Sequence, residues 1–378
     1  MGKLGINWQS VFLVVIFILL LAGGLGLYLQ SVRLMGVLFA VAALVLLLFS
    51  RQKLNLPKGF FLFFVFLVLL GANVAWSREK LATLEYLVMF AGGGVIWLLF
   101  YNMGEKFKAN FERLLLILGI VFGVSLIINW LVFPELPVRP WSLYLPGPTS
   151  RMHNHLGDLW ATVVIIVVHK LLTKPRWWHW VVSAMGVYFL AISLSRSAYL
   201  ALAVGIVYLF NQLGLTKKFK RLYIIFLLLV TGLFLYAAFF KSTLLARPYF
   251  GQVLWGLFKW PWGVGVGNFG IISSDIHSPW WDWQRVGIIS SLTHNIILEI
   301  LAGMGILGFI FVGWLTHVLM DLFKHSKQTL FSAVFLAITV NFMFDTTYYI
   351  PTMLWLWFAS LGLAQVGENK DKIAKFSV

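Results

Sequence analysis

Long runs of apolar residues, separated by short polar and basic segments, are the dominant pattern along this chain. In the run "FLVVIFILLLAGG" no polar residue interrupts the sequence, whereas strands of a membrane barrel alternate apolar and polar residues. A helix that crosses a bilayer needs about 20 apolar residues. Hydropathy therefore predicts about twelve membrane-spanning helices, at residues 10–28, 34–50, 59–76, 82–101, 113–133, 157–172, 177–194, 197–211, 222–240, 293–320, 328–346 and 348–366.

Composition supports this interpretation. Hydrophobic residues make up 61% of the 378 residues and charged residues only 11%, and the mean hydropathy is +0.90. Soluble domains are far less apolar. The first run, from about Val11 to Tyr28, is too long for a signal-peptide core and lacks a clear cleavage site, so we interpret it as a retained helix. We predict an all-α, polytopic integral membrane protein with one membrane domain over residues 1–378.

The net charge of +16 does not indicate a nucleic-acid partner. A nucleic-acid binder gathers its basic residues on one accessible face, whereas here they form short clusters between apolar runs, as the positive-inside rule requires. With a cytoplasmic N-terminus, the clusters on the cytoplasmic side are "RQKLNLPK", "EKFKANFER", "HKLLTKPR", "TKKFKR", "KHSK" and "ENKDKIAK". Both termini are then cytoplasmic, and anionic membrane lipids are the expected partners of these charges.

This orientation exposes two larger segments on the outer face, at residues 134–156 and 241–292. Functional residues are found on loops more often than their share of the chain suggests, so we expect the chemistry at the outer face. Within the second loop, an apolar stripe predicts a short helix lying in the membrane interface. The stripe consists of Phe250, Val253, Leu254, Leu257 and Phe258.

Two outer-face arginines are the first candidates for chemistry. Arg196 stands between two apolar runs, and Arg247 follows a long one. Arginine beside hydrocarbon is costly and tends to be paired or functional, and its planar fork suits phosphate oxygens. A snorkelling arginine that reaches lipid headgroups gives the same pattern. Weaker candidates of the same kind are Arg139, Arg151 and Arg285.

His294 is the second candidate, in the stretch "SSLTHNIILEILAGMGILG". Histidine is the side chain best suited near neutral pH to accept a proton from a sugar hydroxyl, although a passive interfacial histidine fits the same position. We expect Ser290, Ser291 or Thr293 to cap the helix that begins there.

Glu299 is the nearest carboxylate along the chain from His294. Five residues at about 100° each separate the two by about 140° around a helix. We therefore expect Glu299 to pair with Asn295, one turn away, or with a neighbouring helix, and to hold the fold of the segment. On this interpretation His294 acts alone as the base.

The glycine run "WPWGVGVGNFG" has Gly265, Gly267 and Gly270 at the G-x-G-x-x-G spacing. A dinucleotide site needs this motif between a strand and a helix, so we predict a tight turn instead, with backbone N–H groups available to an anion. The scarce acidic residues form no ligand pattern, and His153 and His155 lack further ligands. We expect no metal or other cofactor, and no cysteine is present for thiol chemistry.

Four segments in this order resemble the O-antigen ligase and polymerase family of bacterial envelope glycosyltransferases. They are "GPTSRMHNHLG", "SLSRSAYLAL", "RPYFGQVLWGLFKWPWGVGVGNFG" and "THNIILEILAGMGILG", the last three within a ligase-like region over residues 196–320. The resemblance implies a GT-C-like fold and a metal-independent, inverting transfer at the outer face of the bacterial cytoplasmic membrane. In that reaction a glycan passes from undecaprenyl diphosphate to a hydroxyl of a glycan or glycolipid acceptor.

Carried over by motif, Arg196 and Arg247 would hold the diphosphate and His294 would take the acceptor proton. Since diphosphate is a good leaving group, two fixed positive charges and one base suffice for such a transfer. The supporting residues would be Asn295, Glu299, Gly265, Gly267, Asn154 and Arg151. The segment around Asn154 departs from the family pattern in its two flanking histidines and Arg151.

Two other functions fit parts of the pattern. The motifs do not identify the acceptor, so a repeat-unit polymerase on the same fold is the alternative to a ligase. A lipid-linked glycan transporter or flippase belongs to a different class and would place polar and charged residues near the bilayer midplane, whereas these candidates gather at one face.

Overall fold

The computed structural model consists of helices and connecting turns, and no strand occurs among the residues it describes. The structure describes residues 54–103, 105–132, 153–193, 195–215, 249–270, 292–325 and 329–366, with isolated positions at 15, 36, 40–41, 43–44, 221, 224–225, 228, 231–232 and 273. The predicted all-α class is confirmed for these residues. The helices predicted over 10–28, 34–50 and 222–240 lie almost entirely outside them.

The helices follow the predicted apolar runs closely. They are α3 (Phe60–Asn73), α4 (Lys80–Asn102), α5 (Glu105–Val132), α6 (His153–Thr173), α7 (Trp177–Ser193), α8 (Arg196–Gln212), α11 (Tyr249–Lys259), α13 (Ile296–Met304), η3 (Gly305–Gly308), α14 (Phe309–His325), α15 (Thr329–Phe342), η4 (Thr347–Tyr349) and α16 (Pro351–Gln365). Two helical segments, Lys80–Asn102 and Ile296–Lys324, are long and apolar enough to cross a bilayer. The number of twelve spans stays a prediction.

Helix α5 begins about two turns before the predicted start at residue 113, within the segment "EKFKANFER". This segment was predicted to be a basic loop, and that prediction is wrong because it carries a buried aromatic face. Phe107 and Phe111 are each 1% exposed, and their rings lie 5.2 and 5.0 Å from the ring of Phe100. About two turns that contain basic residues are thus part of the start of the helix.

The prediction of one continuous helix over 293–320 is also wrong. Helix α13 ends at Met304, Gly305 has a left-handed φ of 61°, and the chain continues as η3 before α14. The cause is a close approach of the turn after α11, because the N–H of Ile306 donates to the carbonyl of Pro261 at 2.8 Å. A Cβ at Gly305 would collide with that carbonyl, so only glycine fits there.

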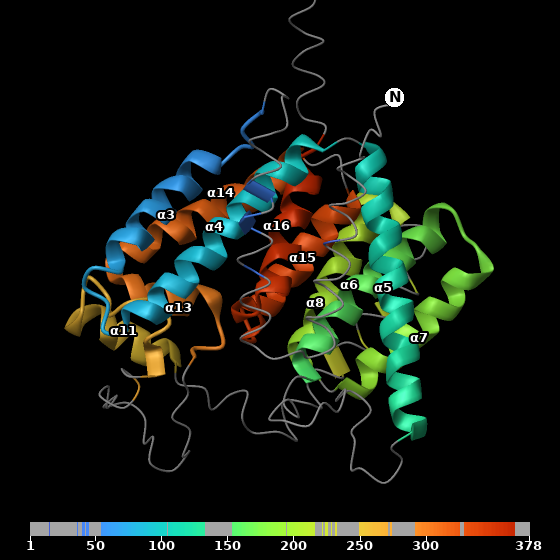
Figure 1. Cartoon of the computed structure of the whole chain (residues 1–378). Helices are drawn as coiled ribbons and strands as arrows, with labels where there is room; N and C mark the ends of the chain where they lie inside the picture. The colour runs from blue at the N-terminus through green and yellow to red at the C-terminus, as the bar shows by residue number, and fades with distance from the viewer. Residues whose placement is uncertain are drawn as a thin grey trace, which may run out of the picture.

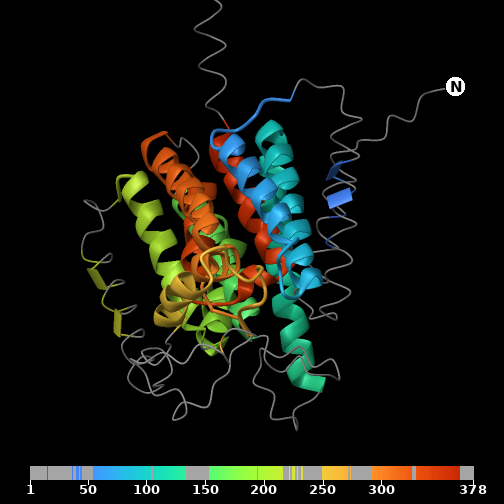
Figure 2. The same ribbon diagram turned by 90° about the vertical axis from the view of Figure 1, so that its left-hand side faces the viewer.

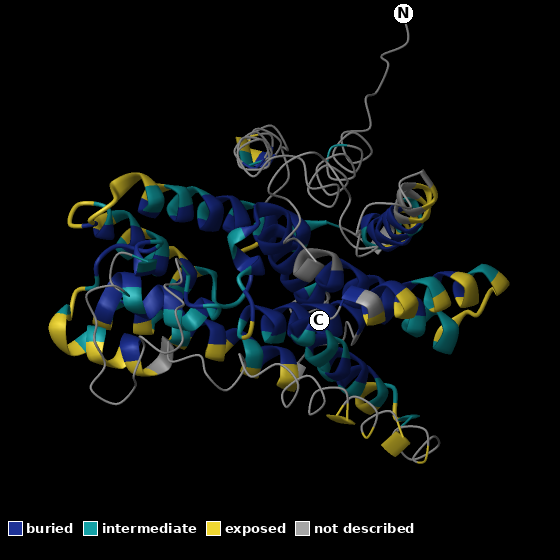
Figure 3. Ribbon diagram, turned by 90° about the horizontal axis from the view of Figure 1, so that it is seen from below, coloured by how far each residue is buried: buried dark blue, intermediate teal, exposed yellow. Residues whose placement is uncertain are grey.

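Helices α15 and α16 form the centre of the molecule, with one group of helices on each side of them (Figure 1). Helix α15 packs against α6 and α8 on one side, and α16 packs against α4 on the other. Every residue of α16 from Pro351 to Gln365 is buried. In Figure 3 the buried positions follow the inward faces of the bundle and the exposed ones its outer edges. The turn between α15 and α16 therefore lies at the junction of the two groups.

Large apolar side chains are exposed on the outside of this bundle, and some polar side chains are buried within its apolar core. Exposed large apolar residues include Phe61, Phe64, Val68, Leu81, Trp177 and Trp180. Buried polar residues include Asn73, Thr83, Asp158, Asn341 and Ser360. Soluble proteins rarely expose apolar stripes of this kind, which mark contact with lipid or a partner.

Helix α11 packs against α13 and η3 near one end of the bundle (Figure 2). The predicted short helix with an apolar stripe is confirmed, and the stripe divides between a buried and an exposed edge. Val253 is buried against Leu301 and Phe269, whereas Leu254 and Phe258 are 43% and 85% exposed. Neighbouring residues point about 100° apart around a helix, so one face packs on α13 and the other faces outward.

Candidate functional site

His294 lies in a short connection that precedes α13 and not in the helix itself. The N-cap of α13 is Asn295, whose side-chain oxygen accepts a hydrogen bond from the N–H of Leu298 at 3.0 Å. Among the described residues, His294 is the one non-glycine residue with a positive φ, 55°. This left-handed conformation costs about 1 kcal/mol or more, and such strain gathers at functional sites. The expectation that Ser290, Ser291 or Thr293 caps this helix is wrong.

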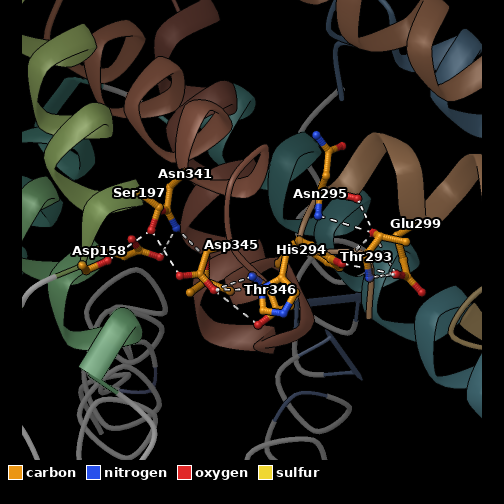
Figure 4. Close-up of polar contacts among 12 residues, drawn as sticks. Asp158, Ser197, Thr293, His294, Asn295, Glu299, Asn341, Asp345 and Thr346 are labelled. Carbon is orange, nitrogen blue, oxygen red and sulfur yellow. Dashed lines mark hydrogen bonds and ion pairs between the residues drawn. The ribbon is translucent and has the colours of Figure 1, made fainter. Parts of the chain in front are cut away.

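Asp345, in the turn between α15 and η4, is the acidic neighbour of His294. Nδ1 of His294 lies 4.0 Å from Oδ1 of Asp345, and the two side chains are 26% and 6% exposed. Asp345 is held in turn by Ser197 and Thr346: the hydroxyl of Ser197 donates at 3.2 Å, and the N–H and hydroxyl of Thr346 donate at 2.6 and 3.4 Å. Figure 4 shows Asp345 between Ser197 and His294. The expectation that His294 has no carboxylate partner is therefore wrong.

Arg196 is the first residue of α8, directly after its N-cap. The cap is Ser195, whose hydroxyl oxygen accepts from the N–H of Ala198 at 3.4 Å. A helix N-terminus carries partial positive charge and favours anions, phosphate groups above all. Because Ser197 in the same turn donates to Asp345, the N-terminus of α8 and His294 meet at one carboxylate.

Glu299 is 1% exposed and accepts several hydrogen bonds close to His294. Its Oε2 accepts from the N–H of Thr293 at 3.0 Å, from the hydroxyl of Thr293 at 3.0 Å and from the hydroxyl of Tyr348 at 3.3 Å. The predicted angle of about 140° between His294 and Glu299 around one helix does not apply, because His294 precedes the helix. Asn295 contacts Glu299 through a backbone hydrogen bond, while its side chain caps α13.

The glycine turn adopts left-handed conformations, with φ of 97° at Gly265 and 86° at Gly267. Its amides have acceptors inside the protein. The N–H of Gly265 donates to the carbonyl of Gly303 at 2.8 Å, and the N–H of Val266 donates to Oδ1 of Asn73 at 3.2 Å. The N–H of Gly267 donates a hydrogen bond to the carboxylate of Glu299. The tight turn is confirmed, and its amides bond within the protein, to α13 through Gly265 and Gly267 and to α3 through Val266.

A second buried polar group adjoins the first. The amide of Asn341, on α15, donates to the carboxylate of Asp158, on α6, and to the hydroxyl of Thr347 at 2.6 Å. Asp158 and Asn341 are 2% and 1% exposed. The sequence interpretation gave neither Asp158 nor Asp345 a role. The available signal was an acidic residue in or beside an apolar run, which is expensive unless paired.

The other predicted site residues are only partly covered by the structure. Asn154 lies in the first turn of α6. Arg151 and Arg247 lie outside the described residues. Within the part of the chain that the structure describes, no three His, Asp or Glu side chains gather in a way that could hold a metal ion.

Neither a family model nor a curated protein sequence matches the chain. The site is therefore interpreted from its own geometry. A partly exposed imidazole beside a buried carboxylate can take a proton from a hydroxyl. The N-terminus of α8, with Arg196 as its first residue, can hold an anion beside it.

Proposed function

We propose that the protein is a membrane glycosyltransferase of the O-antigen ligase type. It moves a glycan from undecaprenyl diphosphate to a hydroxyl of a glycan or glycolipid acceptor. One observation carries the proposal: Asp345 joins the imidazole of His294 to the first turn of α8, where Arg196 begins the helix. Glycan transfer from a diphosphate carrier needs a base for the acceptor hydroxyl and a positive group for the leaving diphosphate. The imidazole and the N-terminus of α8 would supply these two parts beside one carboxylate.

In the proposed reaction the acceptor oxygen attacks the anomeric carbon of the donor from the face opposite the diphosphate. The new C–O bond forms as the bond to the diphosphate breaks, so the configuration inverts. His294 takes the proton of the acceptor hydroxyl, and the diphosphate leaves with the bonding electron pair. Arg196 and the N-terminus of α8 stabilise its negative charge, and Arg247 is proposed as a second positive charge.

We place the protein in the bacterial cytoplasmic membrane, with both termini in the cytoplasm and the site at the outer face. The basic clusters support this orientation. The exposed stripe of Phe61, Phe64 and Val68 on α3 supports contact with lipid. Because Arg196, Arg247 and His294 are all expected at one face of the membrane, the sequence favours an interfacial enzyme over a transporter with a midplane site.

A repeat-unit polymerase uses the same donor chemistry with a different acceptor. The envelope glycans of a deletion strain separate the two. Loss of the glycan-capped acceptor indicates a ligase, whereas accumulation of single repeat units indicates a polymerase.

The proposed base is tested by His294→Ala. With a defined diphosphate-linked glycan donor, we expect kcat to fall by about 10²–10⁴-fold, the usual contribution of a general base. Donor binding, measured with the purified protein in detergent, stays within about threefold because the diphosphate is held elsewhere.

His317→Ala is the matched control. His317 is an exposed histidine of α14 that lies beside Gly59, away from Asp345. Its replacement leaves the transfer rate unchanged. Near-normal transfer by His294→Ala would overturn the base assignment and with it the proposed function.

A further inference from the structure

Hydrogen bonds on both sides of His294 tie it to the turn that carries Asp345. On one side, Oε2 of Glu299 accepts from Thr293 and also from the hydroxyl of Tyr348 in η4. On the other side, the side-chain amide of Asn295 donates to the carbonyl of Met343 at 3.0 Å. The residues before and after His294 are thus both fixed to the segment 343–348.

Thr293 also closes a small ring over His294. Its hydroxyl lies 2.8 Å from the carbonyl oxygen of Asn295 and accepts from the N–H of Asn295 at 3.4 Å. The backbone N–H of Thr293 donates to Glu299. Residues rarely hold a left-handed conformation unless the surroundings over-determine it. Here the ring between Thr293 and Asn295 fixes the backbone at φ 55°, and Glu299 fixes the ring.

Glu299 is buried, and removing its carboxylate from water costs free energy. A buried carboxylate is strongly unfavourable unless donors surround it. The donors around it include the Thr293 amide, the Thr293 hydroxyl, the N–H of Gly267 and the hydroxyl of Tyr348, which is itself 1% exposed. Glu299 also lies in the first turn of α13, where the helix end favours negative charge.

We propose that Glu299 is a positioning residue for the proposed transfer. Through Thr293 it holds His294 in the left-handed conformation, and through Tyr348 it holds the imidazole beside Asp345. This inference rests on the proposed function, because it assigns how the proposed base is aimed. It makes Thr293 the residue through which the effect passes.

The test compares kcat and KM of four variants in the full-length protein. Glu299→Gln keeps a carbonyl acceptor and should retain kcat within about tenfold, whereas Glu299→Leu removes the acceptor and should lower kcat by about 10²-fold, the loss expected from a small misplacement of a catalytic group. Thr293→Ser keeps the hydroxyl and should stay near wild type. Thr293→Val, the isosteric partner, should lose about tenfold or more. In all four, KM for the donor should change by less than about threefold.

A double variant separates positioning from general damage to the fold. If Glu299 acts only by aiming His294, then adding Glu299→Leu to His294→Ala should leave the residual rate unchanged. A further drop of that rate, or a rise in KM equal to the fall in kcat, would overturn the proposal. If Glu299→Leu does not fold, the Thr293→Ser and Thr293→Val pair decides, and equal kcat in the two overturns it.

The result for His294→Ala alone distinguishes this inference from the function on which it rests. Full activity of that variant removes the proposed function. Loss of transfer in His294→Ala, with wild-type kcat in Glu299→Leu and Thr293→Val, removes only the positioning role.

Discussion

A histidine works as a base only if its imidazole keeps one orientation and its protonated form is stabilised. Asp345 is placed to stabilise the protonated form by its charge, since its Oδ1 lies at ion-pair distance, 4.0 Å, from Nδ1 of His294. The carboxylate is itself fixed, because Ser197 donates to one oxygen and the N–H of Thr346 to the other.

Asp345→Asn tests this role. The substitution keeps the shape of the side chain and removes its charge, so we expect kcat to fall by about 10²-fold or more with little change in donor binding. Steady-state kinetics with the lipid-linked donor measures both. Ser197→Ala, which removes one of the donors to Asp345, should lose less than about tenfold. Wild-type kcat in Asp345→Asn would show that His294 acts without this carboxylate.

Local sequence patterns could predict the candidates within one segment but not their partners. His294, Asn295 and Glu299 are visible because they share one short motif. Asp345 is distant along the chain, and only packing of α15 and α16 brings it to His294. The left-handed backbone at His294 has no signal in the hydropathy pattern, since hydrogen bonds among Thr293, Asn295 and Glu299 impose it.

Hydrogen bonds from the turn between α15 and α16 connect the two groups of helices. Asp345 accepts from Ser197 on α8, and Thr347 shares Asn341 with Asp158 on α6. Tyr348 donates to Glu299 on α13. A movement of one group relative to the other would therefore change the geometry of the candidate base. Close packing of α16 keeps the groups in place.

Gly362→Ala tests that packing. A Cβ at Gly362 would lie 2.7 Å from the carbonyl oxygen of Trp97 on α4, a backbone atom that cannot turn aside. Small residues let membrane helices approach this closely. We expect a loss of about 1–3 kcal/mol in stability, seen as a lower midpoint of thermal unfolding in detergent.

Gly313→Ala is the control for that substitution. A Cβ at Gly313, in α14, meets nothing within 4 Å. Alanine there should be neutral or slightly stabilising because of its higher helix propensity. Equal midpoints for the two alanine variants would show that α4 and α16 do not depend on this contact.

At the level of elements, hydropathy predicts well where helices lie and poorly where they break. Long apolar runs indicate α4, α7 and α8 to within a few residues, since length and apolarity are local properties. The break at Gly305 arises from contact with Pro261 in a different part of the chain. A local pattern contains no information about that contact.

The proposed orientation of the whole molecule in the membrane predicts which surface residues face the outside of the cell. The chain has no cysteine, so single cysteines can be introduced without altering the background. Trp262, in the turn after α11, is 60% exposed and belongs to the proposed outer face. Lys174, exposed after the end of α6, belongs to the proposed cytoplasmic face. Along α6 it lies roughly 24 Å from Asp158 and the polar site, at about 1.5 Å per residue.

We expect Trp262→Cys to react with a membrane-impermeant maleimide in intact cells, because the proposed outer face is open to the medium beyond the cytoplasmic membrane. Lys174→Cys should react only after the cells are permeabilised. Labelling of both variants under denaturing conditions controls for thiol content. Both residues are exposed at the protein surface, so the rest of the chain does not shield either thiol. The reverse pattern would place the site in the cytoplasm, where a base at His294 would face nucleotide-activated donors instead of an outward-facing lipid-linked glycan.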